Sequence, residues 1–358
     1  MITPQGPAAH GARRPVAIWL LICCAMIYAM IVLGGLTRLT GSGLSMVHWN
    51  PIFGIVPPMG HAAWEKVFTA YQRSPEYRDI NFDMDLAGFK RIYYVEYAHR
   101  VLGRTIGMVF LLPLLYFWVR RRIPPGLTPR LVVLFVLGGL QGLLGWYMVK
   151  SGLVNVPHVS QYRLTAHLGF ALILYALILW TALDLLRPRA VGPGSPALRR
   201  ARRLAIATAC LVYVTMLAGG FVAGLKAGFA YNTFPLMDGR WLPPNMFALH
   251  PWWRNLFENI GTVQFDHRVL ALLTFAAVCM VWIVARRAAP GRRARIGLHL
   301  WLLAAFVQVG LGIATLLLIV PIPLASAHQA SAVLLLTLAI FTVHALFPAR
   351  EARDASIA

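Results

Sequence analysis

Eight apolar runs, each close to the length that crosses a bilayer, constrain the fold of this chain more than any other feature. They lie at 16–36, 97–119, 131–149, 163–186, 204–224, 267–285, 298–319 and 325–347. A helix needs about 20 apolar residues to cross the hydrocarbon core of a bilayer. Of the 358 residues, 59% are hydrophobic and 13% are charged, and soluble domains carry about twice that charged share. The sequence therefore predicts an all-α polytopic membrane protein with eight transmembrane helices.

The net charge of +21 is distributed as a topology signal and not as a nucleic-acid-binding surface. Both tails, together with the loops on their side of the membrane, hold 19 Lys and Arg residues against three Asp and Glu residues. The two long loops on the opposite side, 37–98 and 225–266, hold nine of each kind. Because cytoplasmic loops collect Lys and Arg, we expect cytoplasmic termini, a lipid bilayer as surroundings and no nucleic-acid partner. The first span lacks a clear cleavage site, so we expect it to be retained.

The last four spans repeat landmarks of the first four. The pairs are Gly34-Gly35 with Gly219-Gly220, His99-Arg100-Val101-Leu102 with His267-Arg268-Val269-Leu270, Gln141 and Gly145 with Gln308 and Gly312, and Thr165-Ala166-His167 with Ser326-Ala327-His328. Four spans return the chain to its starting side, so the two copies share one orientation. We therefore expect an internal duplication that gives two tandem four-helix bundles, 1–190 and 191–358. The glycines either allow close helix approach or leave room for a flat macrocycle.

Four histidines, each near the start of a span, are the candidate metal ligands: His99, His167, His267 and His328. An ionisable residue inside a membrane is costly, and it usually faces the bundle interior with a partner. Neutral imidazole is a good iron ligand. In each half, a histidine of the second span and one of the fourth can face each other across a porphyrin. A purely hydrogen-bonding role for these histidines is the alternative.

The two halves differ beside their first histidine. Glu96 lies three residues before His99 and on the same helix face, whereas Gln264 holds that position before His267. A carboxylate at a heme edge can accept a proton or stabilise developing positive charge. A salt bridge or a favourable charge at a helix N-terminus is the structural alternative. The difference suggests one reactive heme site and one that stores or transfers electrons.

Arginines follow both of these histidines directly. Arg100 and Arg268 are candidate contacts for heme propionates, because Arg binds carboxylates in bidentate fashion. Their alternative role is interfacial snorkelling. His48 and His158 lie in external segments, where they either assist substrate entry or proton movement or are ordinary interfacial side chains. The four cysteines lie inside spans, so we expect no external disulfide.

In combination, these motifs resemble the heme A synthase family of cytochrome oxidase assembly. The matching segments are Gly34 to Ser45 with Trp49-Asn50-Pro51, Glu96 to Arg104, Thr165 to His167, Asp266 to Arg268, and Ala327-His328. The resemblance extends from about residue 15 to 347. Some members carry a cysteine pair in the first external loop, which segment 37–98 lacks. The chain thus resembles the branch found in proteobacteria and mitochondria, and the short N-terminus favours a bacterial inner membrane.

The resemblance implies a specific reaction. Such enzymes convert heme O to heme A by two successive hydroxylations of the porphyrin C8 methyl group, followed by loss of water to leave a formyl group. It implies that His99 and His167 bind the substrate heme, that Glu96 is the catalytic carboxylate, and that His267 and His328 bind a permanent heme b.

Two other functions remain open from the residues alone. A di-heme b-type electron carrier explains four histidines but gives Glu96 no particular role. A heme transporter or chaperone predicts a labile heme in the N-terminal half and no oxidised product. Heme O synthase, an electron-transfer partner and a second copy of the chain are candidate partners that the sequence does not decide.

Overall fold

The computed structural model describes residues 7–48, 54–153, 157–187 and 195–348. Within these ranges the fold is helical, and eight helices are long and apolar enough to cross a membrane. The prediction of an all-α, eight-span, multi-pass membrane protein is confirmed. The eight helices are α1 (Pro7–Leu39), α4 (Leu86–Val119), α5 (Thr128–Gly152), α6 (Gln161–Leu186), α7 (Pro196–Gly224), α9 (Ile260–Arg287), α10 (Arg292–Leu317) and α11 (Ile322–Ala345).

Several of these helices, α4 and α9 among them, begin well before the apolar runs from which they were predicted. The Asp85 side chain caps α4 by accepting a hydrogen bond from the Gly88 N–H at 2.7 Å. Asn259 caps α9 in the same way, accepting from the Thr262 N–H at 3.2 Å. Side-chain caps satisfy backbone N–H groups that have no partner within the helix. Consequently His99 lies well inside α4 and not at its start, which corrects the boundary expected from hydrophobicity.

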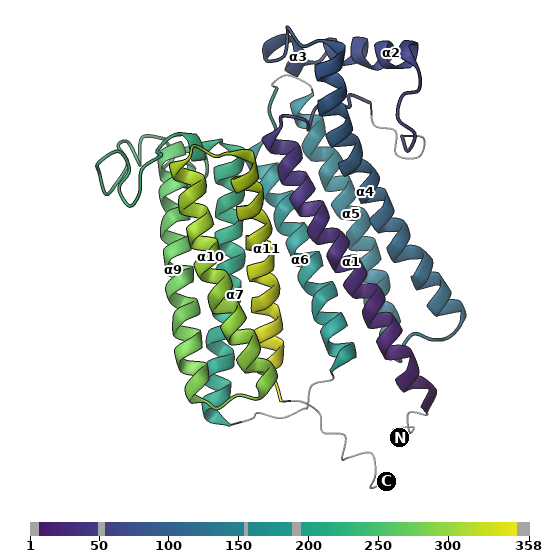
Figure 1. Ribbon diagram of the computed structural model, residues 1–358, viewed down its shortest axis with the longest axis vertical. Helices are drawn as coiled ribbons and strands as arrows, with labels where there is room; N and C mark the ends of the chain where they lie inside the picture. Colours follow the sequence, from purple (N-terminus) through teal and green to yellow (C-terminus); the bar gives the residue numbers. More distant parts are fainter. Residues whose placement is uncertain (1–6, 49–53, 154–156, 188–194, 349–358) are drawn as a thin grey trace.

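The long loops also contain short helices. The segment after α1 forms α2 (His61–Gln72) and α3 (Pro75–Asp79), and the segment after α7 forms η1 (Ala227–Phe229), η2 (Trp252–Arg254) and α8 (Asn255–Glu258). Both loops lie at the same end of the helices (Figure 1), which we call the loop end. The opposite end, where α1 and α10 begin and α6 and α11 end, is called the basic end.

The long helices are arranged in two neighbouring groups (Figure 1). In one group, α1 and α5 each pack against α4 and α6; in the other, α7 and α10 each pack against α9 and α11. The groups also contact each other, because α1 and α6 pack against α11 and α6 packs against α7. Division into two bundles by duplication, with a boundary near residue 190, stays a prediction.

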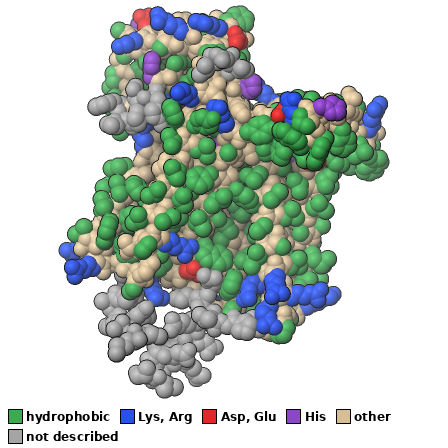
Figure 2. Space-filling model, turned by 180° about the vertical axis from the view of Figure 1, so that it is seen from behind, with side chains coloured by type: hydrophobic (Ala, Val, Ile, Leu, Met, Phe, Trp, Pro, Cys, Tyr) green, Lys and Arg blue, Asp and Glu red, His purple; other side chains and the backbone are tan. Residues whose placement is uncertain are grey.

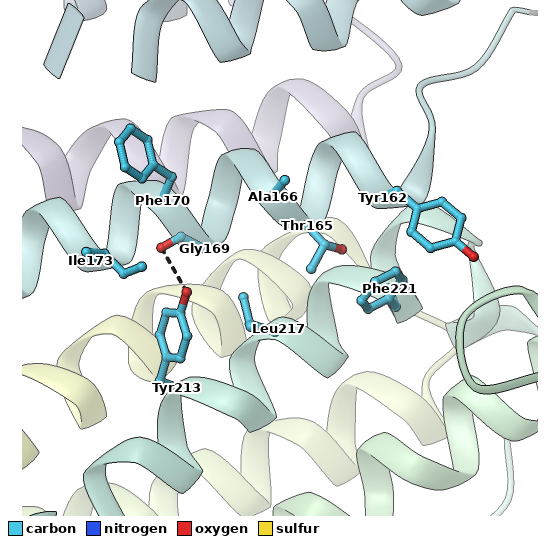
Figure 3. A pocket seen from close by; sticks show the side chains of 9 residues that line it. All are labelled: Tyr162, Thr165, Ala166, Gly169, Phe170, Ile173, Tyr213, Leu217 and Phe221. Atoms are coloured by element: carbon cyan, nitrogen blue, oxygen red, sulfur yellow. Dashed lines mark hydrogen bonds between the residues drawn. The ribbon is translucent and has the colours of Figure 1, made fainter. Parts of the chain in front are cut away.

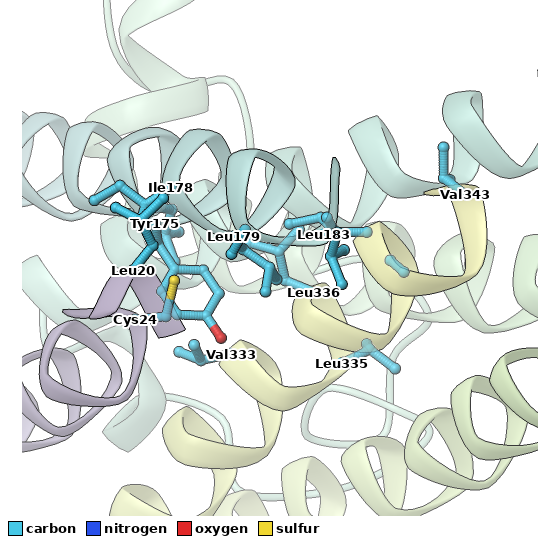
Figure 4. Packing of buried hydrophobic residues seen from close by; sticks show 14 of the residues in the cluster. Leu20, Cys24, Tyr175, Ile178, Leu179, Leu183, Val333, Leu335, Leu336 and Val343 are labelled. Carbon is cyan, nitrogen blue, oxygen red and sulfur yellow. The ribbon is translucent and has the colours of Figure 1, made fainter. Parts of the chain in front are cut away.

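The contact between the two groups is a tightly packed core. Leu20 and Cys24 of α1 meet Tyr175 of α6 and Val333 of α11 (Figure 4), and all four are at most 5% exposed. The Tyr175 hydroxyl also shares a 2.7 Å hydrogen bond with Thr337 Oγ1. Between membrane helices, close packing and such hydrogen bonds supply the attraction that hydrophobicity cannot. The four cysteines are free thiols.

The surface matches a membrane-spanning body. In Figure 2, hydrophobic side chains cover the middle of the helices, while Lys and Arg side chains gather towards the two ends. An apolar belt flanked by charged zones fits the thickness of a bilayer and its two polar interfaces.

Candidate functional site

The first histidine pair lies inside the group formed by α1, α4, α5 and α6. His99 on α4 packs against Gly34 of α1, where an added Cβ atom would lie 3.2 Å from Nε2 of the imidazole. His167 on α6 packs against Gly145 of α5, where a Cβ atom would lie 2.9 Å from Cε1 of the imidazole. The two imidazoles are close enough to interact electrostatically. The fold therefore brings the predicted pair into one site.

The second pair repeats this arrangement. His267 on α9 packs against Gly219 of α7, with 3.1 Å between its Cε1 and an added Cβ atom. His328 on α11 packs against Gly312 of α10, with a corresponding distance of 2.9 Å. These two imidazoles also interact electrostatically. Each of the four glycines thus makes room for an imidazole of a neighbouring helix, which is more specific than the general helix approach expected from the sequence.

A glutamine accompanies the second histidine of each pair. Gln141 Nε2 lies 3.1 Å from Nδ1 of His167 and also donates to the His167 carbonyl at 2.9 Å. Gln308 Nε2 lies 3.2 Å from Nδ1 of His328. The recurrence of Gln141 as Gln308 was visible in the sequence, but their contact with the histidines was not. Such contacts fix the orientation of an imidazole ring.

Glu96 is surrounded by hydrogen-bond donors. Its side chain accepts from Ser45 Oγ at 2.7 Å and from the Met46 N–H at 2.8 Å, and it pairs with Arg100 at 2.5 Å. Glu96 is only 2% exposed. The salt bridge that the sequence left as an alternative is therefore present. The carboxylate fastens the segment after α1 to α4, within one helical turn of His99.

Gln264 makes the complementary arrangement in the other half. Its Nε2 donates to the carbonyls of Ala227 and Tyr231, at 3.0 and 3.1 Å. Arg268 donates to the Tyr231 carbonyl at 2.8 Å and to the Thr233 carbonyl at 2.9 Å. The two loops thus present opposite groups to equivalent positions. Donors surround a carboxylate in the first half, and carbonyls surround an amide in the second.

The remaining candidate residues lie around the loop end. Arg100 donates to the carbonyls of Met46 and His48, at 2.8 and 3.2 Å, so it binds the same segment as Glu96. The side chains of His48 and His158 are exposed. Trp49-Asn50-Pro51, part of the family motif, lies outside the described residues. Among the described residues, no hydrogen bond or ion pair joins either external histidine to the histidine pairs.

Sequence reasoning missed a second buried carboxylate, Glu76 of α3. It is 7% exposed and accepts a hydrogen bond from the Tyr71 hydroxyl at 3.1 Å. Burial raises its pKa to about 7, the Tyr71 hydrogen bond opposes that shift, and the negative charge of Glu96 adds to it. Tyr71, which donates to Glu76, stacks on Phe89 of α4, and no local pattern in the sequence indicated this burial.

An apolar cavity of about 400 Å³ lies between α6 and α7. Figure 3 shows Tyr162, Gly169 and Ile173 of α6 facing Tyr213 and Phe221 of α7 across it. Its lining includes none of the four histidines. The cavity therefore belongs to the contact between the helix groups and not to either histidine pair.

The two histidines of each helix group can together supply two ligands to one bound cofactor. Among the described residues, no cluster of three or more His, Cys, Asp or Glu side chains could hold a bare metal ion. Nδ1 of His267 is buried and has no hydrogen-bond partner among these residues. Two imidazoles in each helix group fit the needs of a heme, whose iron takes neutral imidazole as a ligand.

Comparison with known proteins assigns the family. The family model described as "Cytochrome oxidase assembly protein" (COX15-CtaA) matches residues 17–340. The heme A synthase of Nitrosospira multiformis is 50% identical over 93% of this chain and 94% of its own length. The heme A synthase of Nitrosomonas eutropha is 51% identical over 93% and 94%. The human heme A synthase COX15 is 47% identical over 94% and 84%. The chain therefore belongs to the COX15-CtaA family of cytochrome oxidase assembly proteins.

Proposed function

We propose that this protein is a heme A synthase, which oxidises heme O to heme A in the membrane. The observation that carries the proposal is the pair of similar histidine sites, of which only the first has a buried carboxylate beside it among the described residues. Relatives named heme A synthase are about half identical to this chain over nearly its whole length. Among the described residues, no specific contact favours an electron carrier or a heme transporter.

His99 and His167 are the proposed ligands of the substrate heme, and His267 and His328 are those of a resident heme b. The glycines beside the four imidazoles support this assignment, because they let each ring sit close to a neighbouring backbone. Gln141 and Gln308 contact Nδ1 of His167 and His328, and Gln308 also lies 3.5 Å from Nε2 of His328, so the two glutamines would help to orient these rings. Heme b, when bound, supplies reversible one-electron transfer.

Each hydroxylation replaces a C–H bond of the C8 methyl group with C–OH. Written with water as the oxygen donor, it releases two protons and two electrons, and an electron-transfer partner must accept those electrons. The geminal diol that results loses water to give the formyl group of heme A. Glu96 is proposed to act through its charge more than as a free proton acceptor, because Ser45, Met46 and Arg100 already occupy its oxygens. A fixed negative charge at the heme edge stabilises positive charge that develops during oxidation. The same contacts hold the carboxylate in position.

Arg100 and Arg268 are proposed to bind heme propionates in addition to their loop carbonyls. Arg268 supports this role, because its Nε is buried and has no hydrogen-bond partner among the described residues. A guanidinium with an unused N–H directed into a protein interior favours an anionic acceptor. The Arg268 contacts to Tyr231 and Thr233 would then order the loop when heme is bound.

The proposed location is the bacterial inner membrane, with both termini in the cytoplasm. The excess of Lys and Arg at the basic end supports this orientation. The histidine pairs and Glu96 then lie towards the outer side, beneath the two loops.

A host that makes heme O but not heme A tests the proposed function. Hemes extracted from its membranes, with and without this chain, are separated by chromatography. We expect heme A only in the presence of the chain. Unchanged heme O beside two bound b-type hemes, with an electron partner present, would favour an electron carrier. A labile heme without an oxidised product would favour a transporter.

A further inference from the structure

A second cavity, of about 270 Å³, lies at the basic end, far along the helices from the loops. It is bounded by Arg187 directly after α6, the first turn of α7, the start of α10 and the end of α11. The cavity therefore lies where the two helix groups meet at the membrane surface. None of its lining residues belongs to a histidine pair, so the heme chemistry does not account for it.

Three arginines line this cavity. Arg187 follows α6, and Arg292 and Arg293 occupy the first turn of α10. Arg187 and Arg293 are close enough for their like charges to interact. The N-cap residue of α10 is Gly291, which has no side chain to accept a hydrogen bond, so the first N–H groups of the helix add a partial positive charge. Like charges gathered in one cavity are unfavourable unless an anion occupies it.

The described protein provides little compensation for this charge. Among the described residues, neither the Arg187 nor the Arg292 guanidinium makes a hydrogen bond or an ion pair. The carboxylate of Asp184 is nearby, but it pairs with His344 of the cavity wall at 3.1 Å. Arg293 stacks on the Phe341 ring at 4.8 Å, which holds its guanidinium in place without neutralising it.

The cavity also has apolar walls. Leu198, Phe347 and Pro348 line it beside the arginines. Its position at the end of the spans places these walls at the boundary between the headgroup region and the acyl chains. Basic pockets between transmembrane helices on the cytoplasmic side bind anionic lipid headgroups. A soluble anion needs the charges alone, whereas a lipid also uses apolar surface.

From these observations we propose that the cavity bounded by Arg187, Arg292 and Arg293 binds the phosphate group of an anionic phospholipid. The lipid would join the two helix groups, because Arg187 belongs to the first and the other two arginines to the second. Guanidinium groups and helix N-terminal N–H groups are both established phosphate donors.

Native mass spectrometry of the purified full-length protein, titrated with phosphatidylglycerol, tests the proposal. The double variant Arg187→Gln/Arg292→Gln removes two charges from the cavity. The control Arg200→Gln/Arg295→Gln removes two exposed charges from α7 and α10 outside it. We expect the cavity variant to bind the lipid at least about tenfold more weakly and the control to bind as wild type, since loss of charge-assisted contacts costs this much or more. Bound heme and a single size-exclusion peak verify that both variants are folded.

Two further arms separate the sources of the phosphate. Phosphatidylcholine has a phosphate but no net charge, so we expect it to bind weakly and equally to all variants. Inorganic phosphate alone is expected not to displace the bound phosphatidylglycerol. Displacement by inorganic phosphate would show a soluble-anion site and overturn the lipid assignment. Equal loss of phosphatidylglycerol binding in both double variants would show a diffuse surface attraction and overturn the site.

Discussion

Replacement of Glu76 by Gln is expected to stabilise the protein at neutral and alkaline pH and to have little effect in acid. Glu76 is 7% exposed within the packed loop after α1. Burial is the main cause that raises its pKa from 4.5 to about 7. The folded protein therefore holds this proton up to about pH 7, whereas the unfolded chain releases it near the ordinary value for Glu.

The sign and size of the effect follow from this difference. Folding becomes less favourable as the pH rises from 4.5 towards 7, and the penalty is complete above the folded pKa. A difference of roughly 2.5 pKa units, at 1.36 kcal/mol per unit, gives about 3 kcal/mol. Gln cannot ionise and keeps an acceptor for the Tyr71 hydroxyl. The variant should thus be more stable than wild type by up to this amount.

The assay compares the unfolding of both proteins in one detergent at about pH 5 and about pH 8. Asp83→Asn, which removes an exposed carboxylate from the same loop, is the matched control. We expect the stability gain of Glu76→Gln to grow with pH and the control to show no such growth. A Glu76→Gln effect that is the same at both pH values would refute the account of this buried carboxylate.

Other predictions concern the histidine pairs. Gly145→Ala is expected to displace His167, because a Cβ atom would lie 2.9 Å from Cε1 of the ring. In a titration of the protein with heme, this variant should bind the substrate heme at least about tenfold more weakly. Gly142→Ala on the same helix, where a Cβ atom meets nothing within 4 Å, should bind heme as the wild type does. His267→Ala should lose the resident heme b, seen as loss of its absorbance in the purified protein, and full occupancy would contradict the ligand assignment. Gly312→Ala should lower heme b occupancy while Gly310→Ala does not, because only the former meets His328.

Hydrophobicity and the repeated landmarks were sufficient to predict the eight helices. They were insufficient for helix starts, because Asp85 and Asn259 cap α4 and α9 within polar sequence. Apolar runs report where a helix enters the membrane, whereas caps decide where it begins. The loops were beyond prediction for a similar reason, since α2 and α3 are held by aromatic packing between separate segments.

The four histidines stood out in the sequence because each is a polar exception inside an apolar span, and their role as iron ligands stays a prediction. Their neighbours were harder to predict. Gly34 and Gly145 were visible as repeated glycines, but only the fold shows that each faces an imidazole. The contact of Ser45 with Glu96 joins residues 51 positions apart and leaves no local pattern. The difference between Glu96 and Gln264 was visible in the sequence. Only the structure shows that hydrogen-bond donors surround Glu96 and that loop carbonyls accept from Gln264.

The division of labour between the two halves is the central claim, and heme analysis of a matched pair of variants tests it most directly. Glu96→Gln and Gln264→Glu exchange the carboxylate and the amide at equivalent positions. Each variant is expressed in a host that makes heme O but not heme A, and the extracted hemes are separated by chromatography. We predict that Glu96→Gln binds both hemes and yields no heme A, whereas Gln264→Glu still yields it. Heme A at the wild-type level from Glu96→Gln would contradict the account.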